Sequence, residues 1–295
     1  DDAWAEEQLR LLGELKFNQE VMCNFLGSSN TLINAKTLGN MSSIDPVYTK
    51  DGLDIFEEPM PDRAYAMTVD TARGIGGDYS TAVVIDVTSV PYKMVAKYRD
   101  NKIAPLLFPN IINKVARDYN SAHVLIEVND IGQQVADILH SDLEYDNILT
   151  TARDANKQYL SPGFGRTTTF GVKMSKQVKR QGCFTFKSLL EEMKLQIFDA
   201  DTISELSTFI EKAGSYQADE GYHDDLAMCL VLFGWLTTNT YFKDLTDIDI
   251  REKLYNNQMR QIEEELTPFG VIISGTEEEV FIAGGDYWKV DTTYR

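Results

Sequence analysis

The chain of 295 residues is poor in cysteine and has no hydrophobic run long enough to cross a membrane. Its three cysteines, Cys23, Cys183 and Cys229, lie far apart and do not have the close spacing of zinc ligands. The longest apolar run, Leu226–Leu236, is much shorter than the about 20 residues of a membrane span. The first residues carry no signal-peptide pattern. The sequence thus disfavours zinc and a membrane anchor, and it predicts a soluble protein of a reducing, intracellular compartment.

The chain also lacks a Gly-Lys pair, and with it the phosphate-binding P-loop of nucleotide hydrolases. The glycine-rich stretch Arg73–Gly77 does not match that pattern. We therefore expect no ATPase site in this segment. There is no internal repeat and no low-complexity tract.

The net charge of −18 argues against nucleic-acid binding when it is taken as an average, but the charge is unevenly distributed. Residues 1–62 carry 12 acidic and 4 basic residues, and residues 244–295 carry 12 acidic and 5 basic residues. The stretch 155–187, by contrast, has seven Lys and Arg residues and no acidic residue. Such a local basic segment suits a phosphate backbone, and on charge alone a solvated loop is an equal alternative.

An apolar content of 43%, with 14 Phe and 14 Tyr, is sufficient for a packed core. Apolar runs bounded by turn residues predict strands, and amphipathic runs predict helices. In chain order, we expect strands 64–70, 80–87 and 92–99, helix 106–119, strand 124–127, helix 132–140 and strand 147–151. This β-β-β-α-β-α-β order is that of an α/β, RNase H-like fold, with a mixed central sheet and flanking helices.

The remaining segments complete the expected domain plan. Helical runs are predicted at 173–181, 186–193, 203–213 and 226–236. The polar, turn-rich residues 31–62 are expected to form a linker or a wrapping arm, followed by a core domain at 63–243. Residues 244–295 are expected to form an acidic tail, with a charged helix around 248–266 and a small hairpin from 271–273 and 280–283. The absence of an initial methionine suggests an excised fragment.

Acidic residues border three of the apolar runs. Asp70 and Glu127 end the first and fourth predicted strands, and Asp224 and Asp225 stand at the start of an apolar helix. Taken singly, each position has an ordinary structural explanation: a turn after Asp70, a hydrogen-bonded strand end at Glu127, and a helix N-cap at Asp224 or Asp225.

Their shared placement favours a joint role. If the first and fourth strands are neighbours, Asp70 and Glu127 lie side by side at one end of the sheet. Carboxylates within a few ångströms repel one another, so the group needs a divalent cation to remain ionised. We therefore predict a Mg²⁺ or Mn²⁺ site formed by Asp70, Glu127 and one of Asp224 and Asp225, suited to phosphodiester hydrolysis.

Other polar residues nearby have two interpretations each. Asn129 or Asp130 is expected to cap the helix that follows the fourth strand. His223 has no partner at zinc spacing, and we expect it either to orient a water or a phosphate or to dock its helix. Arg73, close to the first acidic position, is a candidate for stabilising phosphate charge, with a surface ion pair as the alternative.

The basic stretch supplies the candidates for DNA binding. Its glycines, threonine hydroxyls and lysines suit contacts to a nucleic-acid backbone that carry no base information. Together with Arg73, these candidates are Arg166, Lys173, Lys176, Lys179 and Arg180.

Three motifs, in order along the chain, resemble the nuclease domain of a tailed-phage large terminase, of the headful-packaging myovirus type. They are Val69–Gly74 with Asp78–Ser80, Ile126–Asn129 and Gly221–Leu226. The likeness extends over about residues 60–240. In addition, Gly13–Glu20 resembles the closing segment of that family's ATPase domain, so residues 1–30 are expected to be the end of an upstream ATPase domain.

The resemblance implies an endonuclease that cuts double-stranded, concatemeric viral DNA when genome packaging starts and ends, with little sequence preference. It implies a metal-binding triad of Asp70, Glu127 and Asp225, with Asp224 as the alternative third ligand, and two Mg²⁺ or Mn²⁺ ions. Met228 stands where some relatives carry a further acid. The implied partners are the portal and the small terminase subunit, and the implied location is the host cell cytoplasm, transiently at the procapsid.

Two other functions remain open from the sequence. One is another RNase H-like nuclease, either a junction resolvase or a transposase-type recombinase, and the products formed from supercoiled plasmid separate these enzymes. The other is a non-catalytic packaging or interaction module in which the acids only cap helices and form ion pairs. In that case Asp70→Asn would leave every activity unchanged.

Overall fold

The computed structural model describes residues 30–129, 131–154, 157–163 and 168–248, and parts of 250–289. Two compact units divide the chain, residues 1–247 and residues 248–295. This division lies close to the expected start of the acidic tail. The predicted ATPase-domain end lies outside the described residues, apart from its last residue, Asn30.

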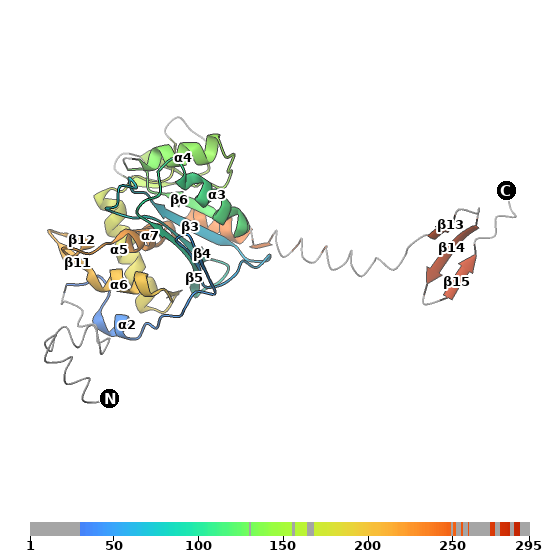
Figure 1. Ribbon diagram of the computed structural model, residues 1–295, viewed down its shortest axis with the longest axis horizontal. Helices are drawn as coiled ribbons and strands as arrows, with labels where there is room; N and C mark the ends of the chain where they lie inside the picture. Colours follow the sequence, from blue (N-terminus) through green and yellow to red (C-terminus); the bar gives the residue numbers. More distant parts are fainter. Residues whose placement is uncertain are drawn as a thin grey trace, which may run out of the picture. The chain divides into compact units, whose positions relative to one another are not determined.

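A mixed sheet forms the centre of the first unit (Figure 1). Strands β3 (Tyr65–Asp70), β4 (Ser80–Asp86) and β5 (Tyr92–Asp100) are joined as antiparallel neighbours, and β6 (His123–Ile126) lies parallel to β3 on its other side. All four were predicted, because each is a run of β-branched and other apolar residues bounded by turns. The predicted RNase H-like arrangement of a mixed sheet with flanking helices is confirmed.

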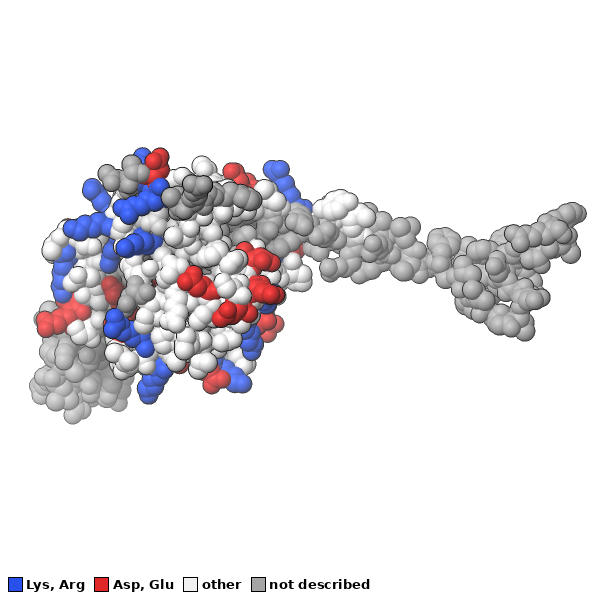
Figure 2. All heavy atoms as spheres, turned by 90° about the horizontal axis from the view of Figure 1, so that it is seen from above, with Lys and Arg blue, Asp and Glu red and all other residues white. Residues whose placement is uncertain are grey.

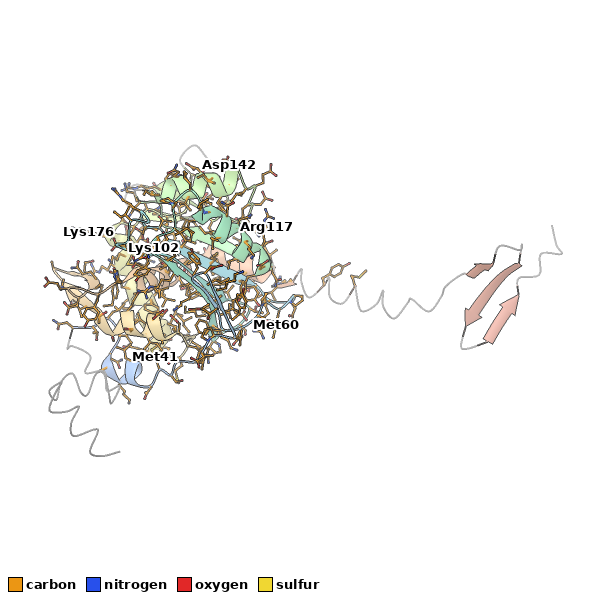
Figure 3. The ribbon with its side chains drawn as sticks, viewed as in Figure 1. Met41, Met60, Lys102, Arg117, Asp142 and Lys176 are labelled. Atoms are coloured by element: carbon orange, nitrogen blue, oxygen red, sulfur yellow. The ribbon has the colours of Figure 1, made fainter. Side chains whose placement is uncertain are left out.

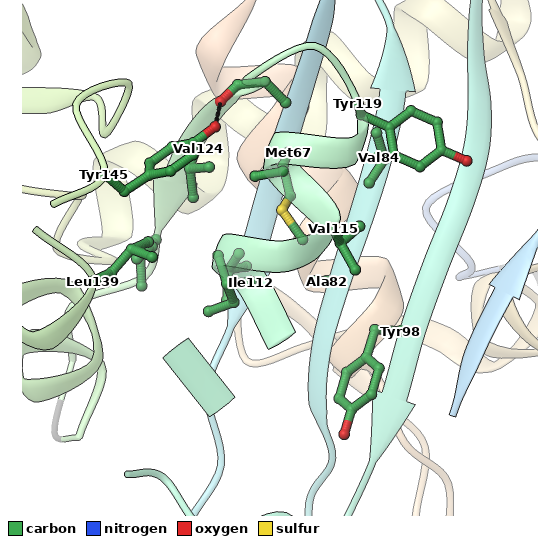
Figure 4. Close-up of a cluster of buried hydrophobic side chains, with 14 of the residues drawn as sticks. Met67, Ala82, Val84, Tyr98, Ile112, Val115, Tyr119, Val124, Leu139 and Tyr145 are labelled. Carbon is green, nitrogen blue, oxygen red and sulfur yellow. Dashed lines mark hydrogen bonds between the residues drawn. The ribbon is translucent and has the colours of Figure 1, made fainter. Parts of the chain in front are cut away.

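Helices cover both faces of this sheet (Figure 1). On one face, α3 (Phe108–Asp118) and α4 (Gly132–Ser141) pack over alternate residues of the strands, and the buried cluster between them includes Met67, Val84 and Ile112 (Figure 4). This alternation follows from the two-residue period of a strand.

The other face is covered by α7 (Asp225–Leu236), which packs against β3, β4 and α5 (Lys176–Glu191). Every residue of α7 is buried, as its continuous apolar sequence predicts. The helices α5 and α7 cross closely at Gly182 and Gly234, where an added Cβ would overlap backbone atoms of the opposite helix. The crossing therefore fixes the position of both helices on the sheet.

Residues 31–62 do not remain separate from the sheet. They form α2 (Ala35–Gly39) and the hairpin β1 (Tyr48–Lys50) and β2 (Leu53–Ile55), and β2 pairs antiparallel with β5. The short strand β10 (Leu195–Gln196) pairs with the start of β5. The hairpin thus extends one edge of the sheet.

The predicted strand 147–151 is the main difference in topology. Only Ile148 bridges β6, at Val124, and the next part of the β6 edge is taken by Val172, which bridges Glu127. Two distant segments thus share the place of one strand. The intervening chain forms a separate sheet of β7 (Thr150–Asp154), β8 (Lys157–Ser161) and β9 (Thr169–Phe170).

Two helical predictions are corrected as well. The runs 173–181 and 186–193 form the single helix α5. The run 203–213 is split, because α6 (Ala200–Thr208) ends and β11 (Phe209–Lys212) turns back into β12 (Ser215–Ala218). The two residues of this turn, Ala213 and Gly214, both have positive φ, as a tight hairpin requires.

In the second unit, β13 (Ile272–Ser274), β14 (Glu278–Ala283) and β15 (Asp286–Lys289) form an antiparallel sheet. The predicted hairpin is confirmed, and β15 is a third strand that was not predicted. Most of the predicted helix 248–266 lies outside the described residues, although residues 248, 250, 251, 255 and 259 are helical. Among the helices that the structure describes, none has the length and apolar character required to cross a membrane.

Candidate metal centre

The parallel pairing of β3 and β6 brings two of the predicted acids together. Val69 pairs with Ile126, and the backbone N–H of Glu127 donates to the carbonyl of Val69 at 2.9 Å. Asp70 and Glu127 therefore leave neighbouring strands at the same end of the sheet. They line a cleft of about 480 Å³ together with Asp224 and Asp225.

Asp70 is half-buried and lines this cleft. The chain turns immediately after it, and the Ser80 hydroxyl accepts a hydrogen bond from the Ala72 N–H at 3.1 Å, which ties the turn to β4. Burial raises the pKa of Asp70 well above its usual value, and the negative charges of Glu127, Asp225 and Asp224 raise it further.

Glu127 is oriented by a residue whose role the sequence analysis misassigned. The Asn129 side-chain amide donates to Glu127 Oε1 at 2.7 Å, and α4 begins without a side-chain cap. The predicted cap at Asn129 is therefore wrong, and Asp130 lies outside the described residues. Burial raises the pKa of Glu127 to about 7, although the Lys179 charge and the Asn129 hydrogen bond act in the opposite direction.

At the start of α7, neither aspartate has the predicted capping role. Asp224 occupies the N-cap position without a side-chain capping bond, and its Oδ2 accepts from the Ala218 N–H at 3.2 Å. Asp225 is 7% exposed, and among the described residues its Oδ2 has no hydrogen-bond partner. Burial raises the pKa of Asp225 to about 6, whereas a hydrogen bond from the Tyr79 backbone lowers it.

The cap comes from Glu205 in α6, which the sequence analysis missed. Glu205 Oε2 accepts from the N–H groups of Leu226 at 2.8 Å and Ala227 at 3.1 Å. Its other oxygen lies 3.0 Å from the Arg99 guanidinium. Burial raises the pKa of Glu205 to about 7, and these amides and Arg99 oppose the shift. No local pattern could have identified this residue, because it lies 21 positions before Leu226.

Two predicted basic residues, Arg73 and Lys179, line the same cleft as the acids. Lys179, in the first turns of α5, is near enough to Glu127 to lower its pKa. Three other predicted basic residues are exposed and are not among the described residues that line the cleft: Lys173, Lys176 and Arg180. Figure 3 shows Lys176 at the margin of the unit, where α5 begins, and basic side chains gather towards one side of the face in Figure 2. Arg166 lies outside the described residues.

His223 is not among the described residues that line this cleft. Its ring meets the Tyr79 ring edge-on at 4.9 Å, and its Nδ1 lies 3.6 Å from Asp225 Oδ2. Asp78, from the glycine-rich loop, is a further acid in the cleft, and its charge raises the pKa of Asp225. Five carboxylates among the described residues therefore line the cleft: Asp70, Asp78, Glu127, Asp224 and Asp225.

A model of the terminase RNase H-like domain matches residues 67–247, which is more than half of the chain and includes every acid of the cleft. The chain belongs to the terminase RNase H-like domain family. The match begins within β3, where Asp70 lies, and it ends beyond α7, where Asp225 lies.

Solved terminase nucleases have the same fold. The large terminase nuclease of the thermophilic phage G20c, with bound magnesium, has 19% sequence identity and a TM-score of 0.54, over 70% of this chain and 97% of that chain. The form with bound cobalt has 21% identity and a TM-score of 0.53 over the same shares. The nuclease domain from Thermus phage P74-26 has 20% identity and a TM-score of 0.50, over 69% and 93% of the two chains.

The donor set of this terminase domain suits a hard divalent cation. Its acidic side chains provide only oxygen donors, which Mg²⁺ and Mn²⁺ prefer, and the buried Asp225 Oδ2, which has no hydrogen-bond partner among the described residues, is an oxygen that a cation would satisfy. Within the described part of the chain, no three His, Cys, Asp or Glu side chains are arranged closely enough to hold a metal ion as they stand. Burial is the largest cause of the raised pKa values of Asp70, Glu127 and Asp225, and repulsion from neighbouring carboxylates raises them further.

Proposed function

We propose that this terminase domain is a metal-dependent endonuclease that cuts double-stranded viral DNA during genome packaging. The observation that carries the proposal is the convergence of Asp70, Glu127 and Asp225 on one cleft, where Asp225 Oδ2 has no hydrogen-bond partner among the described residues. Family membership supports the same function. The magnesium and cobalt bound to the related G20c nuclease support a divalent cation.

In this proposal Asp70, Glu127 and Asp225 hold the cation. Asp225 is preferred to Asp224 because Asp224 Oδ2 accepts a hydrogen bond from Ala218, whereas Asp225 Oδ2 has no such partner among the described residues. When bound, two Mg²⁺ or Mn²⁺ ions would activate water for in-line attack and stabilise the leaving oxygen of the scissile phosphate.

The other residues of the cleft bind and orient. Asn129 keeps the Glu127 carboxylate in one orientation through its 2.7 Å hydrogen bond. Lys179 and Arg73 supply positive charge on the wall of the cleft, where a phosphate group would enter. Contacts of this kind follow the DNA backbone, so cleavage should have little sequence preference and should be weakened by salt.

The finer details of the biological role rest on the resemblance of the motifs. We propose headful packaging of the myovirus type, with the portal and the small terminase subunit as partners and concatemeric DNA as substrate. The host cytoplasm, at the procapsid, is the corresponding place of action.

The test is a nicking assay on supercoiled plasmid at low salt, with Mg²⁺ or Mn²⁺. The parent should produce nicked and linear DNA, and Asp70→Asn and Glu127→Gln should each lose this activity. Asp142→Asn is the matched control, because Asp142 is an exposed acid at the end of α4 (Figure 3). A parent that fails to nick, or acid variants that cut as well as the parent, would refute the proposal. Strand joining, or cutting restricted to branched DNA, would indicate a transposase-type or a resolvase activity instead.

A further inference from the structure

The first turn of α7 has two requirements that compete for the same side chains. Its leading backbone N–H groups have no partner within the helix and need acceptors. The acceptors nearest in sequence are Asp224 and Asp225, and Asp is a favoured residue at such positions. Both aspartates also line the acidic cleft, where the proposed function requires their oxygens.

Glu205 resolves this competition from another helix. It is 5% exposed, and one of its oxygens accepts from both Leu226 N–H and Ala227 N–H, at 2.8 and 3.1 Å. The carboxylate of Glu205 therefore occupies the position that an N-cap side chain would take. A negative group at a helix N-terminus also interacts favourably with the helix dipole.

Arg99 of β5 holds Glu205 in this place. Its guanidinium lies 3.0 Å from Glu205 Oε1 and 4.0 Å above the centre of the Tyr79 ring. Tyr79 is also the residue whose backbone donates to Asp225. On the opposite side, the Thr81 hydroxyl donates to the carbonyl of Asp225 at 3.1 Å. Glu205 of α6 thus accepts from two amides of the first turn of α7, and Thr81 of β4 donates to the carbonyl of Asp225. Together these hydrogen bonds fix that turn.

We infer that Glu205, held by Arg99, is a positioning residue of the metal centre. It takes over the capping of α7 and so leaves the carboxylates of Asp225 and Asp224 to the cation. Without Glu205, the free amides of Leu226 and Ala227 would recruit one of these aspartates, which would turn away from the cleft. This inference rests on the proposed function, because it assigns a role toward the same site.

The first measurement is Mn²⁺ binding in the absence of DNA, by isothermal titration calorimetry. Partners that orient metal ligands typically contribute 10–100-fold to metal affinity, so Glu205→Ala should weaken Mn²⁺ binding by roughly that factor. Glu205→Gln keeps an oxygen that can accept from both amides and loses the charge that faces Arg99. Its affinity should lie between those of the parent and Glu205→Ala, and the Mg²⁺ concentration for half-maximal nicking should follow the same order.

The matched control is Asp199, a carboxylate on the same helix that is equally buried, at 4% exposure. Asp199 caps α6 itself, by accepting from Thr202 N–H at 2.8 Å, and it pairs with Lys97 at 2.6 Å. Asp199→Ala removes a buried, ion-paired helix cap without removing an acceptor from α7. It should lower the melting temperature, as Glu205→Ala should, while Mn²⁺ affinity measured well below that temperature stays near the parent value.

Three results would overturn the inference: Glu205→Ala binding Mn²⁺ as tightly as the parent, Asp199→Ala weakening it equally, or Glu205→Gln binding no better than Glu205→Ala. If Glu205→Ala does not fold, Glu205→Gln decides. The inference is overturned if Glu205→Gln binds Mn²⁺ as tightly as the parent. It is supported if Mn²⁺ affinity falls several-fold in Glu205→Gln but not in Asp199→Asn. Failure of the proposed function has a different signature. In that case the parent would not nick DNA, and Asp70→Asn would bind Mn²⁺ as tightly as the parent. Both results are independent of the Glu205 variants.

Discussion

Removal of the Asp225 charge should make the metal-free protein more stable, although it destroys the proposed metal site. Asp225 is almost completely buried, and its pKa is raised from 3.8 to about 6. A shift of about two pKa units corresponds to about 3 kcal/mol at 1.36 kcal/mol per unit. Water that remains around the carboxylate and rearrangement of the cleft both reduce this value. We therefore expect Asp225→Asn to raise the free energy of unfolding by about 1–3 kcal/mol at pH 8.

The sign of the pH dependence follows from the direction of the shift. A carboxyl group with a raised pKa in the folded state destabilises that state only when it is ionised. The penalty is therefore absent below the unfolded pKa, near 4, and complete above about 6. The advantage of Asp225→Asn over the parent should be complete at pH 8 and should shrink to about a third of that value at pH 4.5.

The assay is urea denaturation with EDTA at pH 8 and at pH 4.5, repeated at pH 8 with Mn²⁺. A ligand present at 100 times its Kd stabilises the folded state by about 2.7 kcal/mol, so saturating Mn²⁺ should restore or reverse the order by stabilising only the parent. Asp142→Asn, an exposed acid on α4, should change stability by less than about 0.5 kcal/mol throughout. The reasoning is refuted if metal-free Asp225→Asn is less stable than the parent at pH 8, or if both proteins gain equally from Mn²⁺.

Three further changes test the crossing, the orientation of a ligand and the DNA contact. Gly182→Ala should lower the free energy of unfolding by about 1–3 kcal/mol in urea denaturation, because its Cβ would overlap a backbone carbonyl of α7. In the control Gly39→Ala the added Cβ meets open space, so the free energy of unfolding should change little. Equal effects of the two substitutions would contradict this. Asn129→Ala should raise the Mg²⁺ concentration for half-maximal nicking roughly tenfold, since Glu127 loses its 2.7 Å hydrogen bond, and an unchanged Mg²⁺ dependence would exclude that role. Lys179→Ala should weaken DNA binding in EDTA and reduce the slope of log K against log salt by about 1 in fluorescence anisotropy titrations, and an unchanged slope would remove Lys179 from the proposed backbone contacts.

The parts of the fold that the sequence predicts well are those with strong local patterns. Strands β3, β4, β5 and β6 are short runs of apolar residues between turns, and α7 is apolar after its first residue. The burial of each segment can therefore be predicted from its own residues. The carboxylates at Asp70, Glu127 and Asp225 stand out for the same reason. Asp70 and Glu127 follow an apolar run and Asp225 precedes one, and a buried charge at such a place is costly unless it has a partner.

The parts that could not be predicted depend on pairing between distant segments. The edge of β6 is shared by Ile148 and Val172, which lie 24 positions apart, and neither forms a strand long enough to produce an alternating pattern. Likewise, the sequence indicates that α7 needs an N-cap and offers two aspartates for it. Only the packing of α6 beside α7 decides that Glu205 takes this role.

The close crossing of α5 and α7 links the two halves of the proposed mechanism. The first turns of α5 carry Lys179, which lines the cleft, and the first residue of α7 is Asp225. Gly182 lies one turn beyond Lys179, and an added Cβ there would overlap the carbonyl and the side chain of Val231 in α7, so a larger residue at 182 would widen the crossing. A protein with a net charge of −18 repels DNA at long range, and a positive charge held rigidly beside the acids offsets that repulsion where cutting is proposed. We therefore expect the small residue at 182 to matter for cleavage as well as for stability, because any widening of the crossing separates Lys179 from the acids that it faces.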